Sequence, residues 1–537
     1  MFNINHEIEL KKRRTFAIIS HPDAGKTTIT EKMLLLGNIV RDSRQNTGKK
    51  NKKYTKSDWM SIEKKRGISV TTSVMQFTYR NILMNLLDTP GHEDFSEDTY
   101  RILTAVDCCL LVIDAAKGIE IRTKNLINVA RTHNIPVITF INKLDRDSRE
   151  PISILDEIEK ELKFLCTPIT WPISCGKNFQ GVYHIYENVI HKYKNIYQNN
   201  TGSCPLNKYS DFFDMLSKHC IDKNLSDSIG KELELIVNIY PKFNKKEFLK
   251  GIVTPVFFGS ALSNFGIDHI LSSLIEWAPS PLHRKSNKRI IQPEEKHFSG
   301  FIFKIQANMN LKHRDRIAFM RIVSGQYKQG ITLRHVRTKK NISISNAVSF
   351  IAGDRFLVEK AYPGDIIGIH NYGTINIGDT FTQGEEIQFL GIPSFASEIF
   401  RKINLRYPIK HKQFLKGLMQ LSEEGTVQFF RPLENNNIIL GAIGSLQFDV
   451  VTERLKTEYN IDAICTQVSV VIARWIRAKD SKILAKFVKC YRPYLAYDSF
   501  NNLIYLAPSF ANFKIVTEEN INISFDNVRE HYSLQNI

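Results

Sequence analysis

Apolar runs of five to eight residues alternate with amphipathic stretches of helical period between residues 16 and 279. Buried strands that alternate with helices are typical of a doubly wound, mostly parallel α/β sheet. Ligands of such sheets bind at the carboxyl ends of the strands, so the residues that follow each run are the first candidates for a site. The runs are Phe16–Ser20, Thr72–Tyr79, Ile82–Leu87, Cys108–Asp114, Val137–Asn142 and Val253–Gly259.

The pattern changes after residue 279. Pro279-Ser280-Pro281 and the charged stretch 283–297 predict an interdomain linker. Short alternating strands with glycine-containing turns then predict a closed β-barrel over about 298–383. We expect a doubly wound α/β domain at 1–280 with an insert at about 150–250, a β-barrel domain at 296–385, and an α+β domain at 390–537.

The third domain is expected to follow the order strand, helix, strand, strand, helix, strand, which is typical of a ferredoxin-like unit. Its helices are predicted at 412–424 and 446–459, and its last strand at 463–476. Phe414, Leu418 and Leu421 recur at helical spacing and predict a buried stripe. Residues 477–537 give weak signals, and no internal repeat is evident.

A phosphate-binding loop is predicted directly after the first apolar run, where a helix-forming stretch follows. In such a loop, backbone N–H groups and the helix N-terminus point at phosphate oxygens, Lys26 reaches the β- and γ-phosphates, and the Thr27 hydroxyl ligates Mg²⁺. Ser20 stands where the usual pattern has its first glycine. The predicted nucleotide contacts here are Ser20, His21, Pro22, Asp23, Ala24, Gly25, Lys26, Thr27 and Thr28.

A second cluster, Asp88-Thr89-Pro90-Gly91-His92, follows the run 82–87. A carboxylate at Asp88 can hold Mg²⁺ through water, and Gly91 lets a backbone N–H approach the γ-phosphate. His92 directly follows that glycine and is the candidate to orient the attacking water. The plain alternative is that these residues form only a tight turn.

Two further strand ends predict recognition of guanine. After residue 141 come Asn142, Lys143, Leu144 and Asp145, and the Asp145 carboxylate can accept from N1–H and the 2-amino group of guanine, which adenine lacks. Asn142 could join the base to the phosphate loop, and the Lys143 stem can lie along the base. Ser260, Ala261 and Leu262 could offer backbone N–H groups to guanine O6.

Residues 41–66 carry ten basic and three acidic residues and little apolar periodicity. This composition predicts a mobile switch segment that ends in Arg66-Gly67-Ile68-Ser69, with Ser69 as a second protein ligand of Mg²⁺. For residues 49–56 a solvated charge run is an equal alternative.

The 537 residues carry a formal net charge of +18, which suggests a polyanionic partner such as RNA, although the richness in Asn, Ile and Lys also fits compositional drift. The eight cysteines include no C-x-x-C pair, so we expect reduced thiols rather than zinc ligands. Because no apolar run approaches the length of a membrane span and the start lacks a signal-peptide core, we expect a cytoplasmic protein without membrane contact.

These motifs, in this order, resemble those of the translational GTPases. The longer matches through Ser57-Asp58-Trp59-Met60, Thr72–Phe77 and Gly91–Tyr100, with 307–309 and 313–316 in the second domain, are most similar to the bacterial release factor 3 family. That resemblance implies a ribosome-stimulated GTPase that binds GTP, GDP and Mg²⁺. It implies that residues 1–280 form a P-loop GTPase domain. It also implies a monomer that acts at translation termination, with the ribosome and the class I, codon-reading release factors as partners, and that it promotes the dissociation of these factors and stimulates their activity.

The resemblance further implies that an apolar gate holds His92 away from the water until the ribosome acts. The gate positions would be Pro22 and Ile68. The insert between Asp145 and Val253 is also found at this place in the release factor 3 and elongation factor G families.

Two other functions remain open from sequence. A translocase of the elongation factor G type would need a further region of about two hundred residues after the third domain, by analogy with that family, and we expect none here. A GTP-gated RNA-binding switch would show no large activation by ribosomes. The chain has no Gly-Gly-Gln, so peptide release by the chain itself is not expected.

Overall fold

The computed structural model of this chain describes residues 2–37, 63, 66, 68–193, 203–205, 223–307, 315–351, 354–407 and 410–530. Most of the predicted switch segment lies outside the described residues, as do Ser57–Met60, residues 308–314 and most of the insert tip at 195–211.

The first domain is built on a seven-stranded sheet in the order β2-β3-β1-β4-β5-β11-β6. All neighbouring strands are parallel except the edge strand β2, which is antiparallel to β3, so the predicted doubly wound sheet is confirmed. The strands are β1 (Arg13–Ser20), β2 (Ser73–Tyr79), β3 (Ile82–Asp88), β4 (Cys108–Asp114), β5 (Val137–Asn142), β6 (Leu165–Pro168) and β11 (Val253–Phe258).

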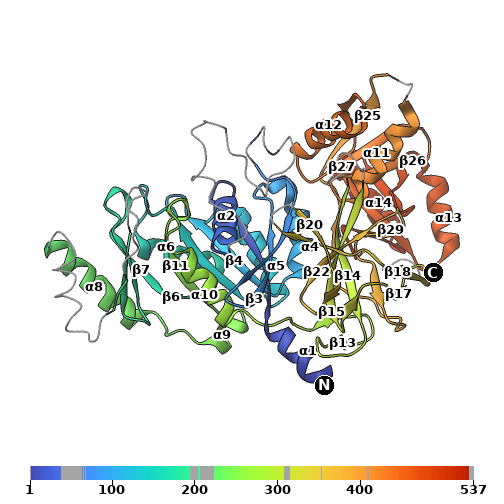
Figure 1. The fold of residues 1–537 in the computed structure, drawn as a ribbon. Helices are drawn as coiled ribbons and strands as arrows, with labels where there is room; N and C mark the ends of the chain where they lie inside the picture. Colours follow the sequence, from blue (N-terminus) through green and yellow to red (C-terminus); the bar gives the residue numbers. More distant parts are fainter. Residues whose placement is uncertain are drawn as a thin grey trace.

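Helices cover both faces of this sheet (Figure 1). Ile102, Leu126 and Ile154, from three helices, share one buried core with alternate strand residues. Ile29 and Ile270 belong to a second core on the other face. The helices of the first face are α4 (Ser96–Ala105), α5 (Ile121–Thr132) and α6 (Pro151–Leu162), and those of the second are α2 (Lys26–Leu36) and α10 (Ile267–Trp277).

The insert forms its own four-stranded antiparallel sheet, in the order β10-β9-β8-β7. It lies at the end of the molecule away from the third domain (Figure 1). Its first part differs from the expectation, because α6 and β6 belong to the main sheet and its helical layer. The elements are β7 (Thr170–Ile173), η2 (Gly176–Asn178), β8 (Gly181–His184), β9 (Val189–Lys192), β10 (Ser203–Pro205), α8 (Lys223–Ile239) and α9 (Lys245–Leu249).

The second domain is an antiparallel sheet of eight strands in the order β18-β17-β23-β14-β15-β22-β19-β20. The described ladders do not pair the two end strands, β18 and β20, so closure of the predicted barrel is not seen among them. The spacing of turns in the sequence could not specify which strands pair. Before it, the linker pairs β12 (Arg284–Lys285) with β13 (Ile290–Ile291). The strands are β14 (Ser299–Ala307), β15 (Arg316–Ser324), β17 (Ile331–His335), β18 (Lys340–Ile344), β19 (Val348–Ile351), β20 (Asp354–Leu357), β22 (Ile366–His370) and β23 (Thr380–Thr382), with β16 (Tyr327–Lys328) and β21 (Lys360–Ala361) as a separate pair.

The third domain begins with the predicted ferredoxin-like unit. Its strands pair in the order β28-β25-β27-β26, all antiparallel, and Phe414, Leu418 and Leu421 are buried as predicted. The elements are β25 (Ile399–Leu405), α11 (His411–Glu423), β26 (Gln428–Pro432), β27 (Ile438–Ala442), α12 (Leu446–Tyr459) and β28 (Ala463–Gln467).

A second unit with the same element order follows, and the sequence did not reveal it. The strand predicted over 463–476 is in fact two strands, of which the second starts the new unit. Pairing of β26 with β30 joins the two units into one eight-stranded sheet. The second unit comprises β29 (Ile472–Ala478), α13 (Ser481–Cys490), η5 (Arg492–Tyr494), β30 (Leu495–Tyr497), β31 (Leu503–Ala507), α14 (Phe510–Glu519) and β32 (Ile523–Asp526), and β33 (Val528–Glu530) returns to pair with β24 (Pro393–Phe395).

Buried polar contacts join the first and second domains. Arg321 of β15 is fully buried and pairs with Asp107, which directly precedes β4. Arg13 donates from Nε to Asp365 Oδ2 at 2.9 Å, and the Thr15 hydroxyl donates to the Gly364 carbonyl at 2.7 Å. Because an uncompensated buried charge is costly, these pairs fix how the two domains meet. Within the described part of the chain, no helix has the length and apolar character needed to cross a bilayer.

Candidate functional site

The sheet register brings the predicted strand-end residues to one edge. Ile18 pairs with Asp88, Ser20 with Val112, and Asp114 with Asn142 in adjacent parallel strands. Side chains far apart in the sequence therefore end at the same level of the sheet.

A cavity of about 250 Å³ lies over the first of these strand ends. It contains the predicted phosphate loop together with residues of two other segments, one before β2 and one after β3. Gly91, His92, Ile68 and Ser69 thus share a space with the loop. The lining residues are His21, Pro22, Asp23, Ala24, Gly25, Lys26, Thr27, Thr28, Ile68, Ser69, Gly91 and His92.

Two glycines are required by close approach in this region. Gly25 has φ of +97°, and a Cβ there would lie 2.5 Å from Asn142 Nδ2. A Cβ at Gly91 would lie 2.8 Å from Lys26 Nζ and 3.3 Å from Pro22 Cα. A side chain at Gly25 would therefore displace the Asn142 amide, and one at Gly91 would displace the Lys26 ammonium.

Ser20, which replaces the first glycine of the usual loop pattern, is buried at the end of β1. Its hydroxyl donates to the His21 carbonyl at 2.6 Å, and Lys26 Nζ donates to Ser20 Oγ at 3.3 Å. A serine is therefore accommodated because its side chain folds back on the loop.

The His21 ring is a feature that the sequence did not single out beyond its place in the loop. It is 1% exposed, it lines the cavity, and neither ring nitrogen has a hydrogen-bond partner among the described residues. Burial lowers the pKa of His21, so the ring is neutral at pH 7.

The three residues predicted to hold Mg²⁺ are an oxygen-only set. Thr27 and Ser69 line the cavity, whereas Asp88 is buried at the end of β3 and lies outside the lining. Two hydroxyls and one carboxylate suit a hard cation that keeps several waters and also binds phosphate oxygens. Thr89 and Pro90 are also outside the lining, and the Thr89 hydroxyl donates to the Ile18 carbonyl at 2.7 Å.

Asn142 joins two loops. Its Nδ2 donates to the Ala24 carbonyl at 2.7 Å, and its Oδ1 accepts from the Ala261 N–H at 2.9 Å. The Ser260 N–H donates to the Phe265 carbonyl. The Ser260 and Ala261 N–H groups therefore already donate within the protein. Of the three residues expected to contact guanine O6, this leaves the N–H of Leu262, a residue that is 51% exposed.

Lys143 is held by a residue for which the sequence had suggested no role. Its Nζ lies 2.7 Å from Asp114 Oδ2. Burial acts to raise the pKa of Asp114, but hydrogen bonds from Lys143 and the Ala116 N–H outweigh it and lower that pKa, so the carboxylate stays charged. The only sequence signal was the position of Asp114 at the end of an apolar run.

Leu144 is fully buried and its N–H donates to the Gly259 carbonyl at 3.2 Å. Asp145 follows with a half-buried side chain. Neither lines the cavity, so the base-recognition candidates lie beside it, along the ends of β5 and β11.

His92 borders the cavity and begins the short helix η1 (Glu93–Phe95). Its side chain is 34% exposed, and its Nδ1 lies 3.0 Å from Asp94 Oδ1. The proposed gate residues Pro22 and Ile68 line the same cavity.

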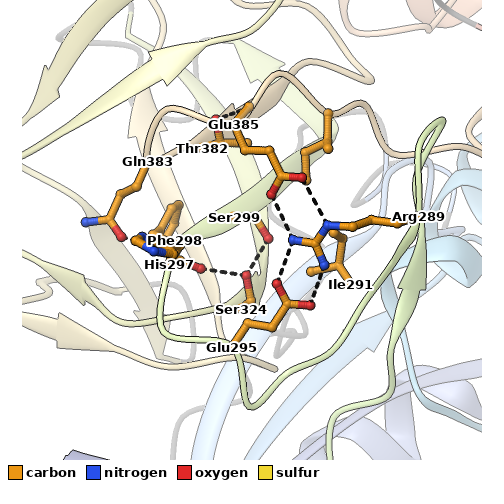
Figure 2. Close-up of a pocket in the computed structure, with 11 residues that line it drawn as sticks. Arg289, Ile291, Glu295, His297, Phe298, Ser299, Ser324, Thr382, Gln383 and Glu385 are labelled. Carbon is orange, nitrogen blue, oxygen red and sulfur yellow. Dashed lines mark hydrogen bonds and ion pairs between the residues drawn. The ribbon is translucent and has the colours of Figure 1, made fainter.

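A second cavity, of about 180 Å³, lies between the linker and the second domain. The polar side chains that line it bond to one another. Figure 2 shows the Arg289 guanidinium between Glu295 and Glu385, each within 2.8 Å. Ser299 and Ser324 bond each other at 2.6 Å. These contacts fasten the linker to the β domain, and we assign the cavity no ligand.

Comparison with family models covers most of the chain. Residues 11–280 match the elongation factor Tu GTP binding domain, and residues 297–384 match elongation factor G domain 2. Residues 389–517 match the class II release factor RF3 C-terminal domain.

Curated relatives match along their whole length. A peptide chain release factor 3 of Buchnera aphidicola subsp. Acyrthosiphon pisum (strain 5A) is 68% identical over 530 residues, which cover 99% of this chain and 100% of the relative. The protein of the same description from Buchnera aphidicola subsp. Schizaphis graminum (strain Sg) is 66% identical over 532 residues, with the same coverage. A crystal structure of a Thermus thermophilus protein shares the fold, with a TM-score of 0.68 at 19% identity over 88% of this chain and 71% of that one.

Proposed function

This chain belongs to the peptide chain release factor 3 family and is a GTPase of translation termination, and from that premise we propose how its residues bind GTP and which partners its hydrolysis serves. The observation that carries the proposal is the single cavity shared by the phosphate loop, Ser69, Gly91 and His92.

The phosphates lie in this cavity. Backbone N–H groups of residues 23–28, at the loop and the N-terminus of α2, face the phosphate oxygens, and Lys26 neutralises the β- and γ-phosphates. Thr27, Ser69 and Asp88 would hold Mg²⁺, which would neutralise charge on the phosphates.

The guanine base binds beside the cavity, at the ends of β5 and β11. Asp145 accepts from N1–H and the 2-amino group, and Leu262 donates from its backbone to O6. Asn142 holds the loops on both sides of the base together, and Asp114 holds the Lys143 ammonium so that its stem lies along the base.

Hydrolysis places a water in line with the γ-phosphate. Its oxygen bonds to the γ-phosphorus as the bond to the β–γ bridging oxygen breaks, which yields GDP and inorganic phosphate. His92 accepts a hydrogen bond from that water and orients it, and Pro22 and Ile68 stand between the ring and the phosphate until the ribosome acts.

The partners are the ribosome and the class I, codon-reading release factors. The chain binds the ribosome differently in its GTP and GDP states, and by linkage the ribosomal conformation that it favours disfavours a factor that prefers another one. The net charge of +18 fits contact with ribosomal RNA. GTP-bound protein therefore speeds departure of the codon-reading factor after peptide release, and hydrolysis then frees the protein itself.

The test is dissociation of a fluorescently labelled class I release factor from ribosomes whose peptide has been released. We expect added protein with GTP to speed dissociation, and protein with GDP to do so much less. No acceleration, combined with GTP-dependent movement of messenger RNA, would favour a translocase instead.

A further inference from the structure

The N-terminal turn of α12, in the third domain, contacts the loop that carries His92. Asp94, two residues after His92, accepts the Leu446 N–H on its Oδ2 at 2.7 Å. Leu446 is the first residue of α12. The same carboxylate places its other oxygen, Oδ1, 3.0 Å from His92 Nδ1. One side chain therefore links the third domain to the ring next to the phosphate cavity.

Asp94 makes two contacts with the Nδ1 atom of His92. It offers Nδ1 both its own backbone N–H, at 3.3 Å, and its carboxylate, at 3.0 Å. The carboxylate contact is the shorter of the two, and the tautomer that it favours is the one in which Nδ1–H donates a hydrogen bond to Asp94 Oδ1. Nε2 is then left as an acceptor, the form that can receive a hydrogen bond from a water.

The fit at this contact leaves no spare room. A Cβ at Gly444 would lie 1.9 Å from the Asp94 carboxyl carbon and 2.3 Å from each of its oxygens. Those are the three nearest atoms that it would meet, so a side chain at this position would displace the Asp94 carboxylate first. The loop before α12 thus closes directly over Asp94.

Apolar packing holds the same two segments together. Val450, one turn further along α12, packs with Phe95 and with Val70, and Leu446 lies against this cluster. Phe95 adjoins Asp94, and Val70 adjoins Ser69. Residues 444–450, the end of the loop and the start of α12, therefore contact both segments that border the phosphate cavity. These are the segment before β2, at Val70, and the segment after β3, at Asp94 and Phe95.

We infer that Asp94 is a positioning residue for hydrolysis, and that the third domain, through Leu446 and Gly444, sets the orientation and tautomer of His92. The inference rests on the proposed role of His92. It means that fast GTP hydrolysis requires the contact between the third domain and the first, whereas nucleotide binding does not.

The experiment is steady-state GTP hydrolysis on ribosomes by four single variants and one double variant of the full chain. Asp94→Asn turns an acceptor toward His92 into a donor and keeps the size of the side chain. Gly444→Ala displaces the carboxylate without removing an atom from the first domain. Glu93→Gln, an exposed neighbour with the same change of charge, is the matched control, and His92→Ala is the reference.

We expect Asp94→Asn and Gly444→Ala to lower kcat by about 10- to 100-fold, while the KM for ribosomes and the affinity for GDP stay near those of the parent. Glu93→Gln should behave as the parent. Added to His92→Ala, Gly444→Ala should cause no further loss, because both changes remove the same oriented ring. If Gly444→Ala does not fold, as judged by thermal unfolding, Asp94→Asn carries the test.

Parental kcat in both Asp94→Asn and Gly444→Ala, with His92→Ala slow, would overturn this inference and leave the proposed function intact. Additive losses in the double variant, or faster hydrolysis by Gly444→Ala without ribosomes, would also overturn it. A parental rate for His92→Ala would instead refute the proposed role of His92.

Discussion

Asn142 Nδ2 donates to the Ala24 carbonyl at 2.7 Å, and this bond ties the end of β5 to the phosphate loop. The amide oxygen at the same time fixes the Ala261 N–H. One buried side chain thus sets the distance between the loop that would hold the phosphates and the loop that would meet the base.

Asn142→Ala should therefore weaken GTP and GDP binding and lower the free energy of unfolding by about 1–3 kcal/mol, because a buried carbonyl and a buried N–H lose their partner. Asn125→Ala, at an exposed position of α5, is the control and should change neither quantity. Calorimetric titration with GDP and urea unfolding measure the two effects. Equal affinities in both variants would contradict the bridging role.

Asp145→Asn should shift nucleotide preference from guanine toward xanthine. The substitution turns one acceptor into a donor, which mismatches guanine and matches the carbonyl at position 2 of xanthine, at a cost for GTP on the order of 2–4 kcal/mol. Asp147→Asn, an exposed position in the same loop, should keep GTP preference. Competition between GTP and XTP for binding measures the shift, and unchanged GTP affinity in Asp145→Asn would refute the assignment.

His92→Ala should separate binding from chemistry. Ribosome and GTP binding should stay close to those of the parent, whereas ribosome-stimulated hydrolysis should fall by about 10²–10⁴-fold, because the water is no longer oriented. Single-turnover phosphate release, compared with filter binding to ribosomes, reports the two quantities. Turnover at the parental rate would show that another group positions the water.

Asp107→Ala should destabilise the junction of the first two domains. It leaves Arg321 fully buried without its carboxylate, and removing one partner of a buried pair costs about 3–5 kcal/mol. Asp107→Ala combined with Arg321→Met should recover part of this loss, since the fully buried guanidinium is then gone and only the partly exposed Arg284, whose Nη2 lies 2.9 Å from Asp107 Oδ1, still lacks its carboxylate. Thermal unfolding of the single and double variants checks both statements, and equal losses in the two would contradict them.

Because the His184 ring is buried, we expect the free energy of unfolding to fall in acid. Burial, followed by the nearby His269 and His191, lowers the pKa of His184 to about 3. The unfolded chain, with an ordinary pKa near 6.5, binds the proton more readily, so the contribution is complete above about pH 6.5 and is lost as the pH falls toward 3. At pH 5 the loss is on the order of 2 kcal/mol.

Urea unfolding at pH 8 and pH 5 measures this effect. His184→Gln should reduce the pH dependence, whereas His283→Gln, an exposed histidine, should leave it as in the parent. The same pH dependence in both variants would show that His184 does not cause it.

The part of the site that could be predicted from sequence is the part made by residues that end strands. Ser20, Asp88 and Asn142 follow recognisable apolar runs, and parallel pairing necessarily brings such ends together. The roles of Asp114 and Asp94 could not be found that way. Each acts through a contact with a distant residue, Lys143 or Leu446, and neither spacing nor periodicity records such a contact.

The second unit of the third domain was missed for a different reason. Its strands β30 (Leu495–Tyr497) and β32 (Ile523–Asp526) have three and four residues, too few to show alternation. A repeated fold also needs no repeated sequence, because many apolar patterns fill the same core. The helix α12, in contrast, begins and ends as predicted, at Leu446 and Tyr459, because its amphipathic stretch is long.

The pairing of β26 with β30, through Arg431 with Tyr497 and Pro432 with Ala496, has a mechanical consequence. Two units that share one hydrogen-bonded sheet are expected to move together when either of them is displaced. A partner that displaces α13 or α14 should therefore also shift the loop at Gly444, which contacts Asp94. A contact made on the far unit could in this way reach Asp94, two residues after His92.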